Sequence, residues 1–250
     1  AKISDWVEKA YFATSRDFNL PENSFAGVSF YAFNRQQMLS GSSNVDLQRI
    51  SMTDAEKYDG AAPINVFGNA PPAGSPGLFA YRNDDGRTAA PDADSIGLLA
   101  FDVDFAVPAN SRFTHTGSFP TAPFNTVICS DGGYFQACAT VPNNFSKLMA
   151  TTAFLMDKQS YRRFPDHESL LIYHTVNAAA PGIAGIRWHE LRKTTGNWQL
   201  YQEGTYAPDS LHRFYPSMNM NSNGQIAAVF NTTSENLWPS IRVVGRNDSD

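Results

Sequence analysis

Residues 182–246 read GIAGIRWHELRKTTGNWQLYQEGTYAPDSLHRFYPSMNMNSNGQIAAVFNTTSENLWPSIRVVGR. Short runs of β-branched and aromatic residues alternate there with Gly, Asn, Asp, Ser and Pro, which is typical of short antiparallel strands. The dipeptide Asn223-Gly224 favours a tight hairpin, because such a turn needs positive φ angles. The stretch therefore predicts two hairpins and a closing strand, at Gly185–Arg192 with Gln199–Tyr206, Arg213–Met220 with Gln225–Thr232, and Ser240–Gly245.

At 250 residues the chain is long enough to bury a sizeable core, as one all-β domain or as two small domains. Aromatic residues make up 13%, and these favour half-buried pleated surfaces. The net charge is −5, and because no block of basic residues occurs we expect no nucleic-acid partner. No apolar run approaches the roughly 20 residues that would span a membrane, so we expect no membrane span.

The predicted strands repeat along the chain in a fixed order. A first kind is apolar and rich in small and aromatic residues, at Val7–Thr14, Gly77–Arg82, Glu168–Val176 and Gln225–Thr232. A second kind follows each of these after a polar loop, at Gly27–Asn34, Gly97–Asp104, Gly185–Arg192 and Ser240–Gly245. A third kind follows in three of the repeats, at Asp46–Ser51, Ser111–Phe119 and Gln199–Tyr206.

Each repeat predicts a small antiparallel meander with two faces that need cover, and β-propellers cover such faces by stacking meanders radially. We therefore expect one propeller domain or half-propeller over residues 1–250, with about four blades that are part of a larger ring. Helix should be limited to single turns near Arg35–Leu39, ended by Gly41, and Thr53–Tyr58. We assign Ser146–Asp157, which is apolar at nearly every position, to the innermost strand of the Glu168 blade.

Several stretches resemble large secreted bacterial β-propeller proteins of uncharacterised function. They are Tyr31–Arg35, Leu99–Phe105, Phe164–Leu170 with His174–Val176, Gly185–Arg192, Gln202–Asp209, His212-Arg213 and Pro239–Arg242. Members of that family are usually longer at the N-terminus. The resemblance therefore implies that this chain is the C-terminal half of such a propeller, and its start at Ala1 suggests a processed or truncated product.

That resemblance implies an extracellular or cell-surface protein that acts as a structural or interaction module and is not an enzyme. Because an open ring leaves two sheet edges exposed, we expect a second polypeptide or a cleaved N-terminal half to complete the propeller. The alternative is a secreted carbohydrate-active enzyme of the sialidase type, for which the partner would be a glycan.

Two cysteines, Cys129 and Cys138, flank a polar segment that has the composition of a loop tip. We favour a disulfide between them, which would fit an oxidising compartment. The alternatives are two reduced core cysteines, which the polar flanks disfavour, and a metal site, for which a completing His/Cys pair is lacking nearby.

The densest group of titratable residues is Asp166-His167-Glu168, with His174 close by in sequence. It is a candidate metal or acid–base site at the mouth of a central channel. The alternative is a polar start of a strand, with Asp166 capping a turn and His167 hydrogen-bonded to a neighbouring blade. In a strand Asp166 and Glu168 would share a face that excludes His167.

Arg187, Arg213 and Arg242 lie in or beside strands of successive repeats and form a second candidate site. A converging arginine cluster can hold the carboxylate of an acidic sugar, as in sialidases. The favoured alternative is a set of ion pairs between blades. Their acidic partners would be Glu190, Glu203 or Asp209.

Two weaker hypotheses concern tryptophans and calcium. Trp188, Trp198 and Trp238 are either stacking platforms for sugars or blade-to-blade packing, and packing is favoured. No cofactor is expected other than a possible Ca²⁺, held by the Asp84-Asp85-Gly86 turn or by Asp102 and Asp104.

Overall fold

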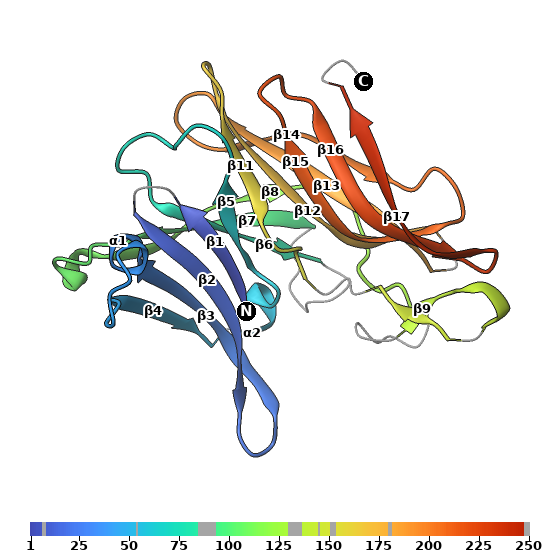
Figure 1. Cartoon of the computed structure of the whole chain (residues 1–250), viewed down its shortest axis with the longest axis horizontal. Helices are drawn as coiled ribbons and strands as arrows, with labels where there is room; N and C mark the ends of the chain where they lie inside the picture. The colour runs from blue at the N-terminus through green and yellow to red at the C-terminus, as the bar shows by residue number, and fades with distance from the viewer. Residues whose placement is uncertain are drawn as a thin grey trace.

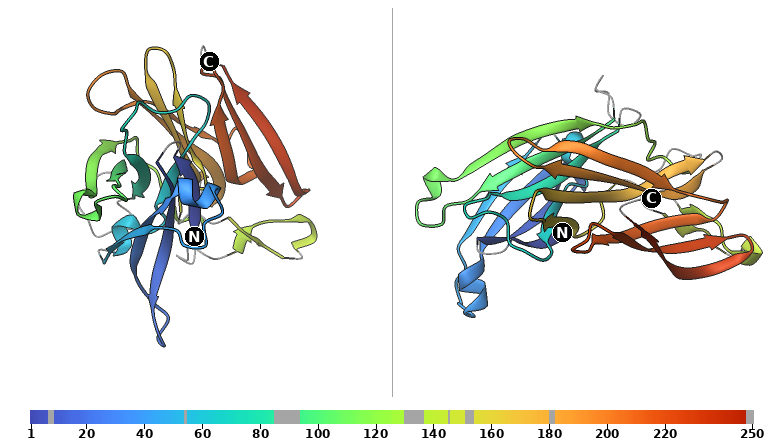
Figure 2. Two further views of the ribbon diagram at one scale, coloured as in Figure 1. Left: turned by 60° about the vertical axis from the view of Figure 1, so that its left-hand side comes forward. Right: turned by 90° about the horizontal axis from the view of Figure 1, so that it is seen from above.

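The structure is a computed structural model, which describes residues 1–6, 9–53, 55–84, 94–129, 137–144, 146–150, 154–179 and 182–247. The fold is all-β, as the sequence predicts, and consists mainly of four antiparallel meanders in chain order. Figure 1 shows the first meander in blue and the last in red on opposite sides of the molecule, with the other two between them. In the views of Figure 2 the sheets fan out from one another.

The first meander is a four-stranded sheet whose strands are neighbours in sequence order. Its strands are β1 (Lys2–Trp6), β2 (Ala10–Asn19), β3 (Ser24–Asn34) and β4 (Leu47–Met52). A single helical turn, α1 (Arg35–Leu39), follows β3, and Gly41 comes after it with a positive φ of 69°. Another short turn, α2 (Ala55–Tyr58), follows β4. Both helical turns were predicted from the sequence.

The second and third meanders are joined into one eight-stranded sheet. The second has β5 (Ala62–Val66), β6 (Gly77–Asn83), β7 (Ser95–Asp102) and β8 (Arg112–Pro120). The third has β11 (Gln159–Arg163), β12 (Glu168–Ala179), β13 (Ile183–Lys193) and β14 (Gln199–Tyr206). The junction is a parallel pair, β5 with β11, in register from Ile64 opposite Gln159 to Val66 opposite Tyr161.

The fourth meander is a three-stranded sheet of β15 (His212–Met220), β16 (Ile226–Ser234) and β17 (Leu237–Arg246). The turn between β15 and β16 contains Gly224 at a φ of 80°, as the Asn-Gly signal predicts. Outside the meanders, β9 (Ala137–Ala139) pairs with β10 (Leu148–Met149), and two 3-10 turns, η1 and η2, span Pro108–Asn110 and Pro142–Asn144.

The repeat pattern predicted the strands well but not every join between them. All three predicted kinds of strand occur as consecutive strands of the meanders, although residues 7–8 of the first lie outside the described residues. The assignment of Ser146–Asp157 to an innermost strand is wrong, because β11 has that place and β10 pairs with β9 instead. The expectation of separate blades also fails at one join, where β5 and β11 lie close enough for backbone hydrogen bonds.

Two main clusters of apolar side chains hold the meanders together. The larger lies between the first and second meanders and extends to β11–β13, with Phe12 and Phe30 edge-on to Phe79 at 5.5 and 5.1 Å between ring centres. Such edge-to-face pairs add to the gain from burial alone. The second cluster lies between the third and fourth meanders. The sheet of β12–β14 therefore packs on both of its faces.

Candidate functional site

Alternation along β12, β13 and β14 brings a group of polar side chains to one face of the sheet, which is the face turned away from the fourth meander. Cross-strand register places His174 opposite Arg187 and Arg187 opposite Thr205, with His189 opposite Glu203. Residues two apart in a strand share a face, so these five side chains form one patch. Both imidazoles are fully buried and Arg187 is 6% exposed. We call these five residues the histidine–arginine cluster.

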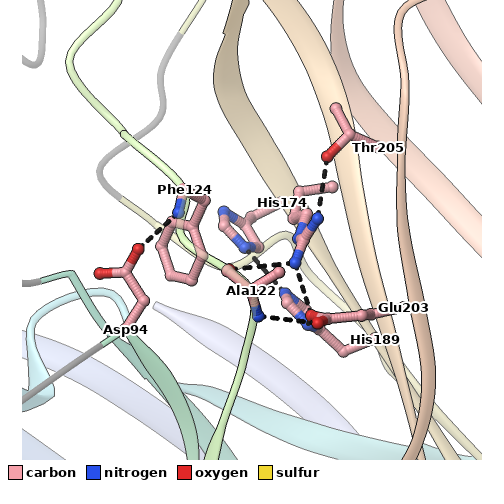
Figure 3. Close-up of polar contacts among 8 residues, drawn as sticks. Asp94, Ala122, Phe124, His174, His189, Glu203 and Thr205 are labelled. Atoms are coloured by element: carbon pink, nitrogen blue, oxygen red, sulfur yellow. Dashed lines mark hydrogen bonds and ion pairs between the residues drawn. The ribbon is translucent and has the colours of Figure 1, made fainter.

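Glu203 is the centre of this cluster (Figure 3). Its Oε2 accepts a hydrogen bond from Nη2 of Arg187 at 2.5 Å and lies 3.1 Å from Nδ1 of His189. Its Oε1 accepts from the backbone N–H of Ala122 at 2.7 Å. Arg187 also donates to the Thr205 hydroxyl at 3.1 Å and to the Ala122 carbonyl at 3.2 Å. The Arg187–Glu203 ion pair thus links β13 and β14 to the segment around Ala122.

The two histidines lie parallel, with ring centres 5.6 Å apart and an angle of 10° between the rings. Their Nε2 atoms are 3.4 Å apart, and the Phe124 ring meets both imidazoles edge-on. Since Nδ1–H of His189 donates to Glu203, its Nε2 is left to accept from Nε2–H of His174. This assignment makes both imidazoles neutral and leaves Nδ1 of His174 an acceptor with no hydrogen-bond partner among the described residues.

Burial decides the protonation of this group. It lowers the pKa of His174 well below the ordinary value, helped by electrostatic interaction with His189 and by the positive charges of Arg82 and Arg187. Burial lowers the pKa of His189 as well, although its bond to Glu203 opposes this. For Glu203 burial alone would raise the pKa, but hydrogen bonds from His189 and Ala122 and the charge of Arg187 together lower it. The site therefore holds one ion pair and two neutral imidazoles.

Residues 121–128 form the cover of the cluster and are held by carboxylates from the second meander. The N–H of Phe124 donates to Asp94 at 2.5 Å. Both the N–H and the hydroxyl of Thr126 donate to the buried Asp84, the N–H at 3.0 Å. This segment therefore links Asp84 and Asp94 on one meander to Glu203 on the next. Because the acid, the base and the cation already bond one another, the arrangement is suited to clamping two meanders together.

The structure separates Glu168 from its two neighbours. Asp166 and His167 lie in the turn between β11 and β12, where Oδ1 of Asp166 is 2.9 Å from Nδ1 of His167, and Asp166 is 81% exposed. The hydrogen bond from His167 is the main cause of the lowered pKa of Asp166. Glu168 begins β12 and instead accepts from Tyr161 at 2.7 Å and pairs with Lys193 at 2.7 Å. The expected shared face of Asp166 and Glu168 is wrong, since Asp166 belongs to a turn and not to a strand.

The three candidate arginines occupy different places. Arg187 belongs to the histidine–arginine cluster, on the face of β13 that is turned away from the fourth meander. Arg213 of β15 forms a two-pronged pair with Asp209, at 2.8 Å to each oxygen. Arg242 of β17 is exposed. Two of the expected ion-pair partners, Glu203 and Asp209, are therefore used, but each pair lies within one meander or a single turn and not between blades.

The carboxylates proposed for calcium have other partners where the structure describes them. Asp102 pairs with Lys9, and Asp104 accepts the N–H groups of Ala106 and Val107 at 2.9 Å each. Asp84 binds Thr126, while Asp85 and Gly86 lie outside the described residues. Across the described ranges no group of three His, Cys, Asp or Glu side chains could hold a metal ion.

The two cysteines are bonded to each other, and the three tryptophans differ in how deeply they are buried. Cys129 and Cys138 form a disulfide with Cα atoms 5.6 Å apart, which confirms the preferred pairing. Trp198 is buried in the larger apolar cluster. Trp188 is half-buried between the third and fourth meanders, and Trp238 is exposed on β17.

Sequence reasoning considered His174, Arg187 and Glu203 separately and missed His189, Thr205 and the combination of all five. A usable signal was present. Arg187 and His189 are spaced by two in β13, and so are Glu203 and Thr205 in β14. Such spacing puts polar groups on one face of paired strands. The contributions of Ala122 and Phe124 were not accessible in this way, because they come from an irregular segment.

Comparison with known proteins gives little guidance. No known protein family matches the sequence, and no curated protein is similar to it. One solved structure, a complex of BT0996 with RGII, aligns over 99% of this chain and 70% of its own length, with a TM-score of 0.43 and 9% identity. That similarity is too distant to transfer a function, so the resemblance to secreted bacterial β-propeller proteins stays a prediction. In the described part of the chain, no helix is long and apolar enough to cross a membrane.

Proposed function

We propose that this chain is an extracellular, non-catalytic interaction module of propeller-like build, and that a second polypeptide or an N-terminal half covers its last sheet. The observation that carries the proposal is the uncovered outer face of β15–β17. Ile241 is 73% exposed, Val243 69% and Val229 41%. Val229 lies opposite Val243, and Ile241 is two residues from Val243 on the same strand, so the three form one apolar patch.

The inner face of the same sheet provides the contrast. Ile226, Ala228 and Phe230 alternate with the exposed positions on β16 and are each no more than 4% exposed. A strand that is apolar on both faces is typical of a sheet that is covered on both sides. Contiguous apolar surface on a folded protein commonly marks a binding surface. We therefore assign the outer face of β15–β17 to contact with a partner.

An extracellular setting is supported by the disulfide between Cys129 and Cys138, since such bonds persist in oxidising compartments. A non-catalytic role is supported by the histidine–arginine cluster, whose acid, base and cation bond one another. The sialidase-type alternative gains no support from the arginines, because Arg187, Arg213 and Arg242 do not converge. A fluorogenic glycoside panel separates the two hypotheses, since turnover would favour the enzyme.

The proposal is tested on the purified chain, with a second copy as the available polypeptide partner. Light scattering should give a mass above 27.5 kDa that rises with concentration. The double variant I241K/V243K should return the mass to that of one chain. A matched control is L39K on α1, where Leu39 is 57% exposed but lies away from this sheet. A wild-type mass of 27.5 kDa at every concentration would contradict the proposal.

A further inference from the structure

A pocket of about 280 Å³ opens between the third and fourth meanders. One wall comes from β13 and β14 through Ile186, Trp188 and Tyr206, and the other from β15 and β16 through Met218 and Ala228. Arg246, near the end of β17, also lines it. We infer that this pocket, which we call the Trp188 pocket, binds a small aromatic anion. The site faces the inner side of β15–β17 and is therefore separate from the proposed partner surface.

The position of Trp188 is set by a glycine on the neighbouring strand. Trp188 lies directly opposite Gly204 in the register of β13 and β14. A Cβ added at Gly204 would come within 3.0 Å of Nε1 of Trp188, so the indole lies against bare backbone. A large ring packed over a cross-strand glycine has little freedom to turn. The pocket thus has a preformed aromatic wall.

The opposite wall is apolar and closely held. Met218 and Ala228 belong to the second apolar cluster and are 6% and 4% exposed. On the first wall, Tyr206 is fixed by its ring contact with Phe230, at 5.8 Å between ring centres. The pocket is therefore a place where two packed sheets fail to meet completely. Small-molecule sites are commonly such mostly apolar recesses with a few polar groups.

Arg246 supplies the polar group of the site. Its guanidinium carbon lies 5.2 Å from the centre of the Trp188 ring, in the geometry of a cation–π contact. A guanidinium has five N–H donors in a planar fork that suits a carboxylate. The contact with Trp188 holds this cation beside the apolar walls, so a ligand can place its ring between the sheets and its anion against Arg246.

These features select the ligand class. Trp188 and Tyr206 offer aromatic surface, and the rest of the lining named above is aliphatic apart from Arg246. A neutral sugar would need several hydrogen-bond partners to replace those it leaves in water. An aromatic ring needs none, and a single carboxylate needs one cation. This reasoning refines the hypothesis that Trp188 is a stacking platform, by replacing the sugar with an aromatic anion.

The test is calorimetric titration of the full chain with 2-naphthoate and with its neutral counterpart, 2-naphthalenemethanol. Wild type should bind 2-naphthoate more tightly than the alcohol by about tenfold, the size of one charge-assisted hydrogen bond. R246Q should remove that difference and leave binding of the alcohol unchanged. The matched control R242Q removes an exposed arginine from the same strand and should bind both compounds as wild type does.

A second variant tests the place of binding. A228L puts a larger side chain on the wall of the pocket and should weaken both compounds at least tenfold, with the far-UV spectrum and melting temperature checking the fold. 2-Naphthoate should perturb the NMR signal of the Trp188 indole N–H in wild type but not in A228L. The inference is overturned if wild type binds neither compound, or if R242Q and R246Q lose the same amount of affinity for 2-naphthoate. It is also overturned if a methyl glycoside binds as tightly as 2-naphthoate, or if a folded A228L binds both compounds as wild type does.

Discussion

The two faces of the sheet β12–β14 pack against the rest of the molecule through different kinds of contact. On one face the histidine–arginine cluster joins the third meander to residues 121–128 and the second meander through directional bonds around Glu203. On the other face apolar side chains meet the fourth meander and leave the Trp188 pocket. Directional bonds fix one geometry, whereas apolar contacts tolerate changes of shape. We therefore expect the polar face to be sensitive to small chemical changes and the apolar face to be permissive.

The largest expected effect is the loss of Glu203. The E203A variant leaves Arg187 buried, with a side chain only 8% exposed and no carboxylate partner. Breaking such a pair from one side costs about 3 kcal/mol, at the low end of the usual range because Glu203 is 19% exposed. Urea unfolding measures the change in the free energy of unfolding.

The control for that experiment is E235A, which removes an exposed glutamate from the turn between β16 and β17 and should change stability by less than about 0.5 kcal/mol. The double variant R187M/E203Q should recover part of the loss, because it removes both charges together. If E203A were as stable as E235A, the Arg187–Glu203 ion pair would not be what stabilises the contact on this face of the sheet.

A second, smaller effect concerns pH. The pKa values of His174 and His189 are lowered by burial, so the folded state binds fewer protons than the unfolded state below the ordinary histidine pKa. The contribution of these neutral histidines to the free energy of unfolding is then fully present above about pH 6.5, and it falls as the pH drops toward their pKa in the folded state. We expect wild type to lose about 2 kcal/mol more than H174Q/H189Q between pH 6.5 and 5.

Denaturant titrations of both proteins at several pH values measure that difference. His212, whose pKa is also lowered by burial, is present in both proteins and cancels in the comparison. Parallel pH profiles for the two proteins would mean that the buried imidazoles do not couple to folding.

The smallest effect belongs to the apolar face. A228L adds volume beside the Trp188 pocket, so we expect stability within about 1 kcal/mol of wild type. The crowded counterpart is G97A, because a Cβ at Gly97 would lie 2.0 Å from the Tyr81 ring and should cost about 1–3 kcal/mol. Thermal unfolding of the two variants beside wild type measures both changes in stability. A larger loss of stability in A228L than in G97A would show that the lining of the Trp188 pocket is not permissive.

The sequence predicted what depends on local pattern. Alternation, turn residues and the repeated strand order gave the four meanders, the Gly224 hairpin and the disulfide. It did not predict β5, a five-residue strand with Pro63 inside it, or the parallel pair that β5 forms with β11. Strands that are about a hundred positions apart in sequence leave no local signal of their pairing.

The candidate sites show the same division. Asp166, His167 and Glu168 are adjacent in sequence. Because the turn between β11 and β12 ends before Glu168, that residue instead contacts Tyr161 and Lys193. Conversely, Glu203 and Ala122 are 81 positions apart and share a hydrogen bond. The cluster and its cover draw on three strands and an irregular segment, and their contacts are specified by packing, which periodicity does not encode.

The outer face of β15–β17 remains the central claim, and sedimentation equilibrium of the purified chain tests it most directly. The account predicts that the average mass rises above 27.5 kDa with concentration and that I241K/V243K stays at 27.5 kDa throughout. Identical single-chain masses for the two proteins over the whole concentration range would contradict it.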